Sequence, residues 1–193
     1  MKSAVSLDDK INHLSLPIAT IEQETCIKNA IHAIPDFPKP GILFRDITPL
    51  LASPTAFATT VDVFANRYQE AGIEAILGLE SRGFLFGAAL SYKMGIPLIP
   101  VRKKGRLPRE TFKQTYLKEY GEDVLELHVD DLQPNQQILI IDDLIATGGT
   151  AEAAIKLVKQ AGANPVEIAC VIELEALKGR DKLSAPVYTI VKY

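Results

Sequence analysis

The stretch Ile138-Leu-Ile-Ile-Asp-Asp-Leu-Ile-Ala-Thr-Gly-Gly-Thr150 decides the fold of this chain. Its four opening residues are apolar and three of them are β-branched, which predicts a buried parallel strand. Asp142 and Asp143 follow where that strand is expected to end, and a turn of small and hydroxyl residues, 146–150, comes next. Apolar residues then recur at helical spacing up to Gly162, so the order is strand, acidic pair, small-residue loop and helix.

The order of these residues fits a ligand that carries both a phosphate group and hydroxyl groups. Ligands of open α/β sheets bind at the carboxyl ends of strands, and a helix N-terminus attracts phosphate through its free N–H groups and its dipole. Gly148 and Gly149 let the backbone approach an anion closely. A carboxylate pair repels phosphate but accepts hydrogen bonds from hydroxyl groups, or binds a metal ion through oxygen. A sugar phosphate meets these requirements, and the alternative is a solvated acidic turn.

All thirteen positions of the stretch resemble the phosphoribosyl pyrophosphate motif of the type I phosphoribosyltransferases. The resemblance implies an α/β fold with a mostly parallel central sheet, flanking helices and a small N-terminal hood. It also implies that Asp142 and Asp143 hold the two ribose hydroxyls. The residues implied to bind the ribose 5′-phosphate are Ala146, Thr147, Gly148, Gly149 and Thr150.

Length and composition predict one domain over residues 1–193, with residues 1–20 as an N-terminal extension. Of the 193 residues, 47% are hydrophobic, which suffices for one well-packed core but is marginal for two. The net charge of -3 does not favour nucleic acid, and no apolar run approaches the length of a membrane span. The two cysteines make no disulfide framework, and Cys170 is expected to be a buried thiol. Because residues 1–5 lack the apolar core of a signal peptide, we expect a cytoplasmic protein.

The run Pro35–Ile47 resembles the base-binding segment of the adenine-specific members of the family. A helical pattern precedes it, from about Pro17 to Ala33, and prolines with a glycine then interrupt regular structure before a short extended piece. The resemblance implies a hood over the base, in which Phe44 stacks on adenine while the main chain at Leu43 and Arg45 reads its edge. Because phenylalanine is usually buried, the alternative places Phe44 in the core.

Two polar segments follow predicted strands and resemble the pyrophosphate-binding loops of the family. Glu80-Ser81-Arg82 follows the strand Ala75–Leu79, and the basic run 102–106 follows the strand Pro97–Val101. Phe84 stands where a P-loop needs lysine, which argues against a nucleotide triphosphatase. The alternative for both segments is a solvated charged surface. The residues implied to bind pyrophosphate are Glu80, Ser81, Arg82, Arg102, Lys103 and Arg106.

The segment 105–121 has little hydrophobic periodicity, which predicts a long irregular loop. It resembles the mobile catalytic loop of the family, which closes over the substrates and excludes water. The resemblance places Glu119 near the imidazole ring of the purine and makes Tyr120 part of the closed site, whereas an isolated glutamate is usually a surface residue. Leu174 is implied to close the other face of the base pocket.

Strands and helices alternate from Ala75 onward, which by itself predicts a mostly parallel sheet with helices on both faces. Further strands are predicted at 124–129, with His128 on the exposed side, and at 165–172. The alternating residues 187–191 predict a last strand at an edge of the sheet.

The resemblance as a whole implies purine salvage, in which adenine and 5-phosphoribosyl 1-pyrophosphate give AMP and pyrophosphate. Mg²⁺ is expected as a cofactor bound mainly through the substrate, and the expected catalytic residues are Glu119, Arg82, Asp142 and Asp143. The family implies a homodimer, and neither nucleic acid nor a membrane is an expected partner. One alternative is a transferase for another purine base, against which the Phe44-Arg45 segment argues. Another is a non-catalytic sensor of phosphoribosyl pyrophosphate, against which the intact loop with Glu119 argues.

Overall fold

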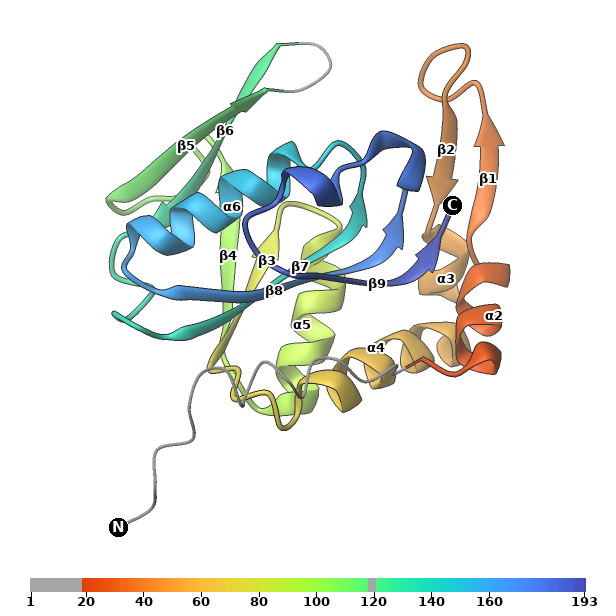
Figure 1. Cartoon of the computed structure of the whole chain (residues 1–193), viewed down its shortest axis with the longest axis horizontal. Helices are drawn as coiled ribbons and strands as arrows, with labels where there is room; N and C mark the ends of the chain where they lie inside the picture. Colours follow the sequence, from red (N-terminus) through yellow and green to blue (C-terminus); the bar gives the residue numbers. More distant parts are fainter. Residues whose placement is uncertain (1–18, 118–120) are drawn as a thin grey trace.

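The computed structural model describes residues 19–117 and 121–193, and a seven-stranded sheet lies at its centre (Figure 1). Its strands are β3 (Ala75–Leu79), β4 (Leu98–Lys103), β5 (Thr111–Leu117), β6 (Glu122–His128), β7 (Gln137–Ile145), β8 (Asn164–Glu173) and β9 (Val187–Lys192). They are arranged in the order β5-β6-β4-β3-β7-β8-β9. The pairs from β4 to β9 are parallel, whereas β6 pairs antiparallel with β4 and β5. The predicted α/β fold, with a mostly parallel sheet and β9 at its edge, is confirmed.

Strand β7 is apolar without alternation because both faces of the sheet are covered. Successive residues of 138–141 pack alternately into two buried apolar clusters, one on each face. The strand continues to Ile145, because β8 pairs with it as far as Glu173. The prediction that the strand ends before Asp142 is therefore wrong. The acidic pair lies within β7, near its carboxyl end.

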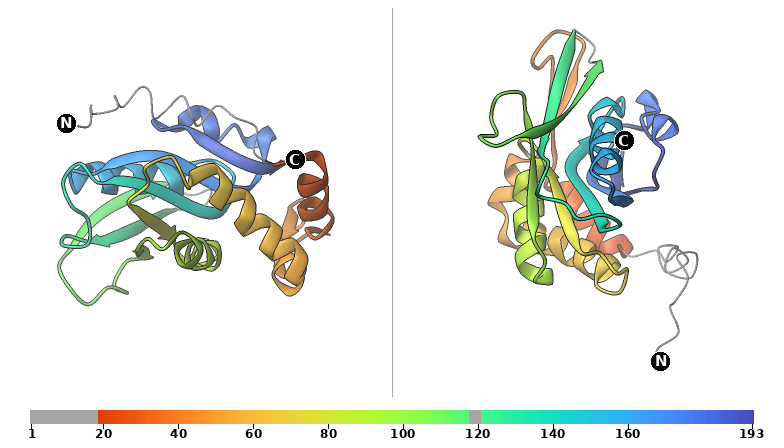
Figure 2. Two further views of the ribbon diagram at one scale, coloured as in Figure 1. Left: turned by 90° about the horizontal axis from the view of Figure 1, so that it is seen from below. Right: turned by 90° about the vertical axis from the view of Figure 1, so that its left-hand side faces the viewer.

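Helices cover both faces of this sheet, as predicted (Figure 2). One face carries α4 (Pro54–Tyr68) and α5 (Gly83–Met94), with α2 (Ile21–Asn29) and the short α3 (Thr48–Ala52) packed beside them. The other face carries α6 (Gly149–Gln160). Helix α4 begins as predicted, because the Ser53 hydroxyl accepts a hydrogen bond from the Ala56 N–H. None of the helices in the described ranges is long and apolar enough to cross a bilayer.

The segment that precedes α3 forms a separate two-stranded antiparallel sheet, β1 (His32–Pro35) with β2 (Leu43–Asp46). This hairpin, which we call the hood, lies beside the C-terminus of the chain (Figure 1). The prediction that the first helix extends to Ala33 is wrong, because α2 ends at Asn29 and β1 pairs with β2 instead. Pro35 contributes to this outcome, since a proline disfavours the helical conformation in the residue before it.

The segment 105–121 is more regular than its sequence suggests. Residues 111–117 form β5, which pairs with β6 from Thr111 opposite His128 to Leu117 opposite Glu122. The prediction of an irregular segment is wrong for this part, because pairing across the hairpin replaces the hydrophobic periodicity that the sequence lacks. Its mobility stays a prediction.

His128 is buried rather than exposed, with 4% of its surface accessible. Its ring nitrogen Nδ1 lies 3.4 Å from the Glu110 carbonyl oxygen. The alternation in 124–129 predicts a half-exposed strand, but β6 lies between β4 and β5 and packs under α6, so its last four residues are all buried.

Between β8 and β9 the chain forms two 3₁₀ helices of three residues each, η2 (Glu175–Leu177) and η3 (Arg180–Lys182). In Figure 1 this segment lies next to the start of α6.

Candidate active site

Three neighbouring parallel strands, β4, β3 and β7, bring most of the predicted site residues to one edge of the sheet. The residues at these strand ends are Glu80, Ser81 and Arg82 after β3, Arg102 and Lys103 in β4, and Asp142 and Asp143 in β7. Helices α5 and α6 both begin at this edge. Their N-termini add partial positive charge where the carboxyl ends of the strands meet.

The acidic pair on β7 keeps acceptor capacity for a ligand. Asp143 is buried, with 3% of its surface accessible, and its N–H donates to Asp142 Oδ1 over 2.9 Å. Arg82 Nη2 lies 3.1 Å from Asp143 Oδ2, yet this oxygen accepts no hydrogen bond of good geometry from the described residues. A buried carboxylate oxygen without a hydrogen-bond donor is costly, so a hydroxyl group of a ligand would be a favourable partner.

Burial makes these two carboxylates hard to ionise together. Burial and the charge of Asp143 raise the pKa of Asp142 well above its ordinary value of 3.8. Burial also raises the pKa of Asp143, against the positive charge of Arg82. Hydrogen-bond donors that arrive with a ligand would favour the ionised pair.

The turn from β7 to α6 lines a cavity of about 170 Å³. All five residues predicted to bind phosphate, Ala146 to Thr150, line it together with Asp142, Leu144, Ile145, Ala151 and Cys170. Gly148 has a φ of 81°, a left-handed conformation that favours glycine. The cavity therefore lies at the N-terminus of α6, where backbone N–H groups are available to an anion.

Close packing of α5 against β7 places Arg82 beside the acidic pair. A Cβ atom on Gly83 would lie 2.7 Å from the Ile141 carbonyl oxygen and 3.0 Å from Asp142 Oδ1. Only glycine fits so close to a neighbouring backbone. Arg82, at the N-terminal boundary of α5, consequently reaches Asp143.

Glu80 organises the cations of the predicted pyrophosphate site. Its carboxylate accepts hydrogen bonds from Arg102 Nε over 3.3 Å, from the Lys103 N–H over 2.9 Å and from Arg106 Nη1. Burial opposes ionisation of Glu80, but the Lys103 N–H, the Arg102 hydrogen bond and the arginine charges together lower its pKa. Because a carboxylate repels a diphosphate, this geometry gives Glu80 the role of an anchor for Arg102 and Arg106. Ser81 is exposed beside it.

Phe44 lies where the hood approaches this edge. Its ring is half-buried and, within the described ranges, belongs to neither apolar cluster of the core. The Arg82 guanidinium carbon lies 5.5 Å from its ring centre, and Phe37 packs edge-on against it at 5.0 Å. Arg82 thus contacts Phe44 and Asp143 together, and connects the predicted base position with the predicted ribose position.

The remaining predicted residues lie farther from this cluster or outside the described ranges. Leu43 is exposed, and the Arg45 side chain packs on the Tyr193 ring with its guanidinium carbon 3.6 Å from the ring centre. Leu174 is half-buried, and its N–H donates to the Ile145 carbonyl oxygen over 3.0 Å. Glu119 and Tyr120 lie outside the described residues.

The end of β5 nevertheless lies close to the phosphate loop. A Cβ atom on Gly149 would lie 3.0 Å from the Leu117 carbonyl oxygen. A second cavity, of about 530 Å³, opens between β5 and α6 and shares residues 147–149 with the first. Strand β5 therefore ends next to the predicted phosphate site.

Three residues that sequence reasoning assigned no role contact this site or its supports. Gly179 contacts the phosphate loop, Arg180 donates to Glu173 at the end of β8, and Tyr193 packs against the hood. The run 177–180 resembles the family in sequence, but that resemblance gives Gly179 and Arg180 no role, because their contacts and those of Tyr193 depend on how the chain folds.

Comparison with known proteins agrees with this geometry. Residues 47–192 match the family described as the phosphoribosyl transferase domain. The chain is 53% identical over 166 residues to an adenine phosphoribosyltransferase of Pseudoalteromonas translucida. The aligned region covers 86% of this chain and 92% of that protein. Over 167 residues it is 52% identical to adenine phosphoribosyltransferase 1 of Triticum aestivum, with 86% and 92% covered.

Solved structures agree with the sequence relatives. The structure of adenine phosphoribosyltransferase from Saccharomyces cerevisiae, complexed with an imino-altritol bisphosphate and adenine, superposes with a TM-score of 0.86 at 45% identity. The match covers 89% of this chain and 100% of that one. The chain therefore belongs to the phosphoribosyltransferase family and, within it, to the adenine phosphoribosyltransferases.

Proposed function

We propose that this chain transfers the phosphoribosyl group of 5-phosphoribosyl 1-pyrophosphate to adenine, giving AMP and pyrophosphate. The observation that carries the proposal is the position of Arg82, which contacts Asp143 on one side and Phe44 on the other. A base stacked on Phe44 and a ribose held by the acidic pair would then be neighbours. The adenine phosphoribosyltransferases that it resembles at about half of all positions support the choice of base.

In the proposed complex, each part of phosphoribosyl pyrophosphate meets complementary groups. The 5′-phosphate would occupy the cavity formed by residues 146–150 at the N-terminus of α6. The ribose 2′- and 3′-hydroxyls would donate to Asp142 and Asp143. The diphosphate would lie near Arg82, Arg102 and Arg106, whose guanidinium groups suit phosphate oxygens.

The transfer step requires charge to move from the anomeric carbon to the leaving group. The bond between this carbon and the pyrophosphate oxygen breaks, and its electron pair leaves with pyrophosphate. The arginines would stabilise the developing negative charge, while the carboxylates of Asp142 and Asp143 would favour the cationic sugar. Purine N9 then forms the new bond and loses its proton. Glu119 is the proposed proton acceptor, on the strength of the family resemblance.

Mg²⁺ fits this arrangement as an ion brought with the substrate. Among the described residues there is no group of three or more His, Cys, Asp or Glu side chains that could hold a metal. Mg²⁺ commonly binds through one or two carboxylates together with substrate phosphates, and the Asp142–Asp143 pair supplies that number. When bound, the ion would supply positive charge to the diphosphate oxygens.

The resemblance also leads us to propose a homodimer located in the cytoplasm. Sedimentation equilibrium of the purified chain tests the first point, and a monomer at assay concentration would contradict it. Fractionation of cells that express the chain tests the second.

A product assay tests the proposed function. Purified protein is incubated with phosphoribosyl pyrophosphate, Mg²⁺ and one base at a time: adenine, hypoxanthine, guanine or orotate. We expect AMP from adenine alone, and no product from the Asp142→Asn/Asp143→Asn variant. Turnover of another base would contradict the proposed role of the hood. Binding of phosphoribosyl pyrophosphate without turnover of any base would indicate a sensor instead of an enzyme.

A further inference from the structure

Gly179 touches the backbone of the phosphate loop directly. A Cβ atom on Gly179 would lie 2.1 Å from the Ala146 carbonyl oxygen and 2.9 Å from the Gly148 nitrogen. The contact is reciprocal, because a Cβ atom on Gly148 would lie 2.5 Å from the Gly179 carbonyl oxygen. Both glycines are buried. Two backbone segments therefore meet with no side chain between them, and a shift of one displaces the other.

The segment that carries Gly179 has little internal structure to keep it in place. It consists of the two short helices η2 and η3, joined at Lys178, whose φ is 51°. Helices of three residues make few hydrogen bonds of their own. The position of Gly179 consequently depends on anchors outside the segment.

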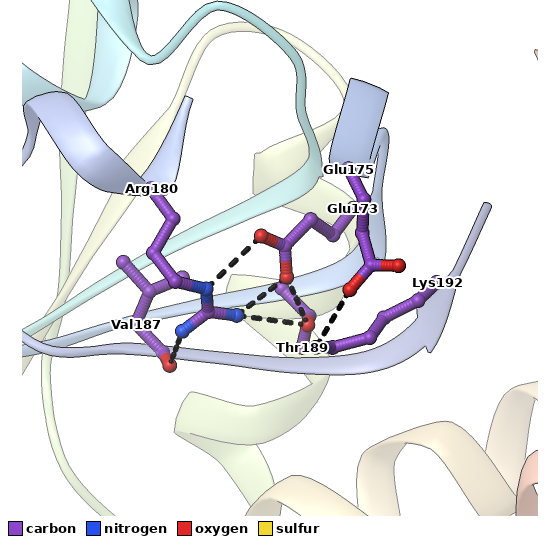
Figure 3. A network of polar contacts seen from close by, with 6 residues as sticks. All are labelled: Glu173, Glu175, Arg180, Val187, Thr189 and Lys192. Atoms are coloured by element: carbon purple, nitrogen blue, oxygen red, sulfur yellow. Dashed lines mark hydrogen bonds and ion pairs between the residues drawn. The ribbon is translucent and has the colours of Figure 1, made fainter. Parts of the chain in front are cut away.

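The Arg180 side chain provides such an anchor, as Figure 3 shows. Its Nε donates to Glu173 Oε1 over 3.0 Å, and its Nη2 donates to Glu173 Oε2. Its Nη1 donates to the Val187 carbonyl oxygen, and Nη2 also lies 3.3 Å from Thr189 Oγ1. The Arg180 guanidinium thus ties the segment that carries Gly179 to the end of β8 and to β9.

Glu173 is well placed to hold this arginine. It is the last residue of β8 and is 5% exposed, and the Thr189 hydroxyl donates to its Oε2 over 2.8 Å. Two parallel hydrogen bonds between a guanidinium and a carboxylate fix orientation as well as distance. Arg180 is therefore held in one geometry by a buried partner.

We propose that Arg180 is a positioning residue for the phosphate loop: through Gly179 it keeps the Ala146–Gly148 backbone in the shape that receives the 5′-phosphate. The inference rests on the proposed function, because it deepens the role of that same loop. A loop that is already ordered loses less conformational freedom when the ligand binds. Loss of the anchor should consequently weaken binding of ribose phosphates and leave binding of the base unchanged.

Four variants separate this role from a general loss of stability. Arg180→Met/Glu173→Gln removes the ion pair without leaving a buried unpaired charge. Arg180→Lys keeps the charge but loses the fork of two hydrogen bonds. Gly179→Ala disturbs the contact itself. The control is Lys192→Met, which removes an exposed ion pair in the same neighbourhood, where Lys192 Nζ lies 2.8 Å from Glu175 Oε1.

The measurements are the Kd for ribose 5-phosphate by calorimetry, KM for each substrate, kcat, and the melting temperature. For Arg180→Met/Glu173→Gln we expect Kd for ribose 5-phosphate and KM for phosphoribosyl pyrophosphate to rise about tenfold, with KM for adenine unchanged. Gly179→Ala should raise the same two constants at least as much. Arg180→Lys should give values of both constants between those of the wild type and the double variant. Lys192→Met should give the wild-type values.

Two outcomes would overturn the proposal. An unchanged Kd for ribose 5-phosphate in the double variant would show that Arg180 does not act on the loop. A parallel rise of both KM values together with a lower melting temperature would assign Arg180 a structural role only. Because the Kd needs no turnover, a wild-type chain inactive with adenine would contradict the proposed function and still leave the role of Arg180 testable.

Discussion

The two ends of the candidate site are built in different ways. The ribose-phosphate end lies within the main sheet, where Gly83, Gly148 and Gly179 allow backbone segments to touch. The base end is the hood, a separate two-stranded sheet in which all four residues of β1 are exposed. Ring contacts join the hood to the body of the molecule. Backbone segments in direct contact cannot shift to make room for a new side chain, whereas side chains in ring contacts can. We therefore expect substitutions at the ribose-phosphate end to cause large losses of activity, and substitutions at the base end to cause smaller ones.

The largest effect is expected from Gly148→Ala, with Gly41→Ala as its matched partner in the hood. Both glycines have a positive φ, 81° at Gly148 and 85° at Gly41. A Cβ atom would meet the Gly179 backbone at 2.5 Å in the first case and nothing within 4 Å in the second. We expect Gly148→Ala to lower kcat/KM for phosphoribosyl pyrophosphate more than about 100-fold, and Gly41→Ala to stay within about threefold.

Initial-rate kinetics with each substrate varied in turn measure this difference. Equal losses in the two variants would mean that backbone conformation alone, and not contact with Gly179, decides the effect. The contrast between the two ends of the site would then disappear.

A smaller effect, confined to the base, is expected from Phe44→Ala. Stacking of a base on an aromatic ring contributes about 1–3 kcal/mol, so KM for adenine should rise about 5- to 150-fold. KM for phosphoribosyl pyrophosphate should stay close to the wild-type value. Phe37→Ala is the matched variant, because Phe37 is 52% exposed and only supports Phe44 edge-on. Phe37→Ala should raise KM for adenine less than Phe44→Ala does. A larger rise would mean that Phe37, and not Phe44, stacks on the base.

The same contrast explains what the sequence predicts and what it does not. The strand Ala75–Leu79 and the order of strand, small-residue turn and helix around the acidic pair are predicted correctly, because apolar runs and turn residues are local signals, although β7 extends past its predicted end to Ile145. Strand β5 is missed, because its stability comes from pairing with β6 and not from its own periodicity. The end of α2 is misplaced for a similar reason, since β1 exists through its pairing with β2.

Site residues follow the same division. The ribose-phosphate end is a contiguous motif that chemistry alone interprets as a sugar-phosphate site. The hood residues Phe44 and Arg45 become interpretable only through family resemblance. Gly179 and Arg180 stay without a role at the sequence level, because their importance depends on contact with Ala146 and Glu173, each on another element.

The acidic pair predicts a pH dependence at the ribose-phosphate end. Burial and the charge of Asp143 raise the pKa of Asp142, so the free protein holds a proton there at a pH where an ordinary carboxyl is already ionised. A carboxylate accepts more hydrogen bonds than a protonated carboxyl, so hydroxyl groups that donate to Asp142 favour its ionised form, and we expect binding to release this proton. Affinity for ribose 5-phosphate should therefore fall as the pH drops through the raised pKa, by at most about tenfold per pH unit for one proton.

Calorimetry in buffers of different ionisation enthalpy counts the released protons. Asp142→Asn should remove most of the pH dependence, while binding of adenine should show none in either protein. A pH dependence that survives in Asp142→Asn would place the responsible proton elsewhere, for example on the phosphate of the ligand.

The smallest effect is expected at the contact that joins the hood to the C-terminus. The Tyr193 ring lies under the Arg45 guanidinium at 3.6 Å, with Lys28 Nζ at 5.3 Å. A cation–π contact at a partly exposed site contributes about 0.5–1 kcal/mol, so Tyr193→Leu should raise KM for adenine about threefold. Tyr92→Leu is the control, since Tyr92 is 92% exposed and lies on α5.

Tyr193→Leu also tests whether the two ends of the site are independent. The Tyr193 N–H donates to the Glu173 carbonyl oxygen over 2.9 Å, and the carboxylate of the same Glu173 holds Arg180. If only KM for adenine rises, the hood can shift without moving the phosphate loop, and the contrast between the two ends holds. If the Kd for ribose 5-phosphate rises as well, Glu173 transmits the disturbance from the C-terminus to Gly179, and the base end of the site is coupled to the ribose-phosphate end through a single residue.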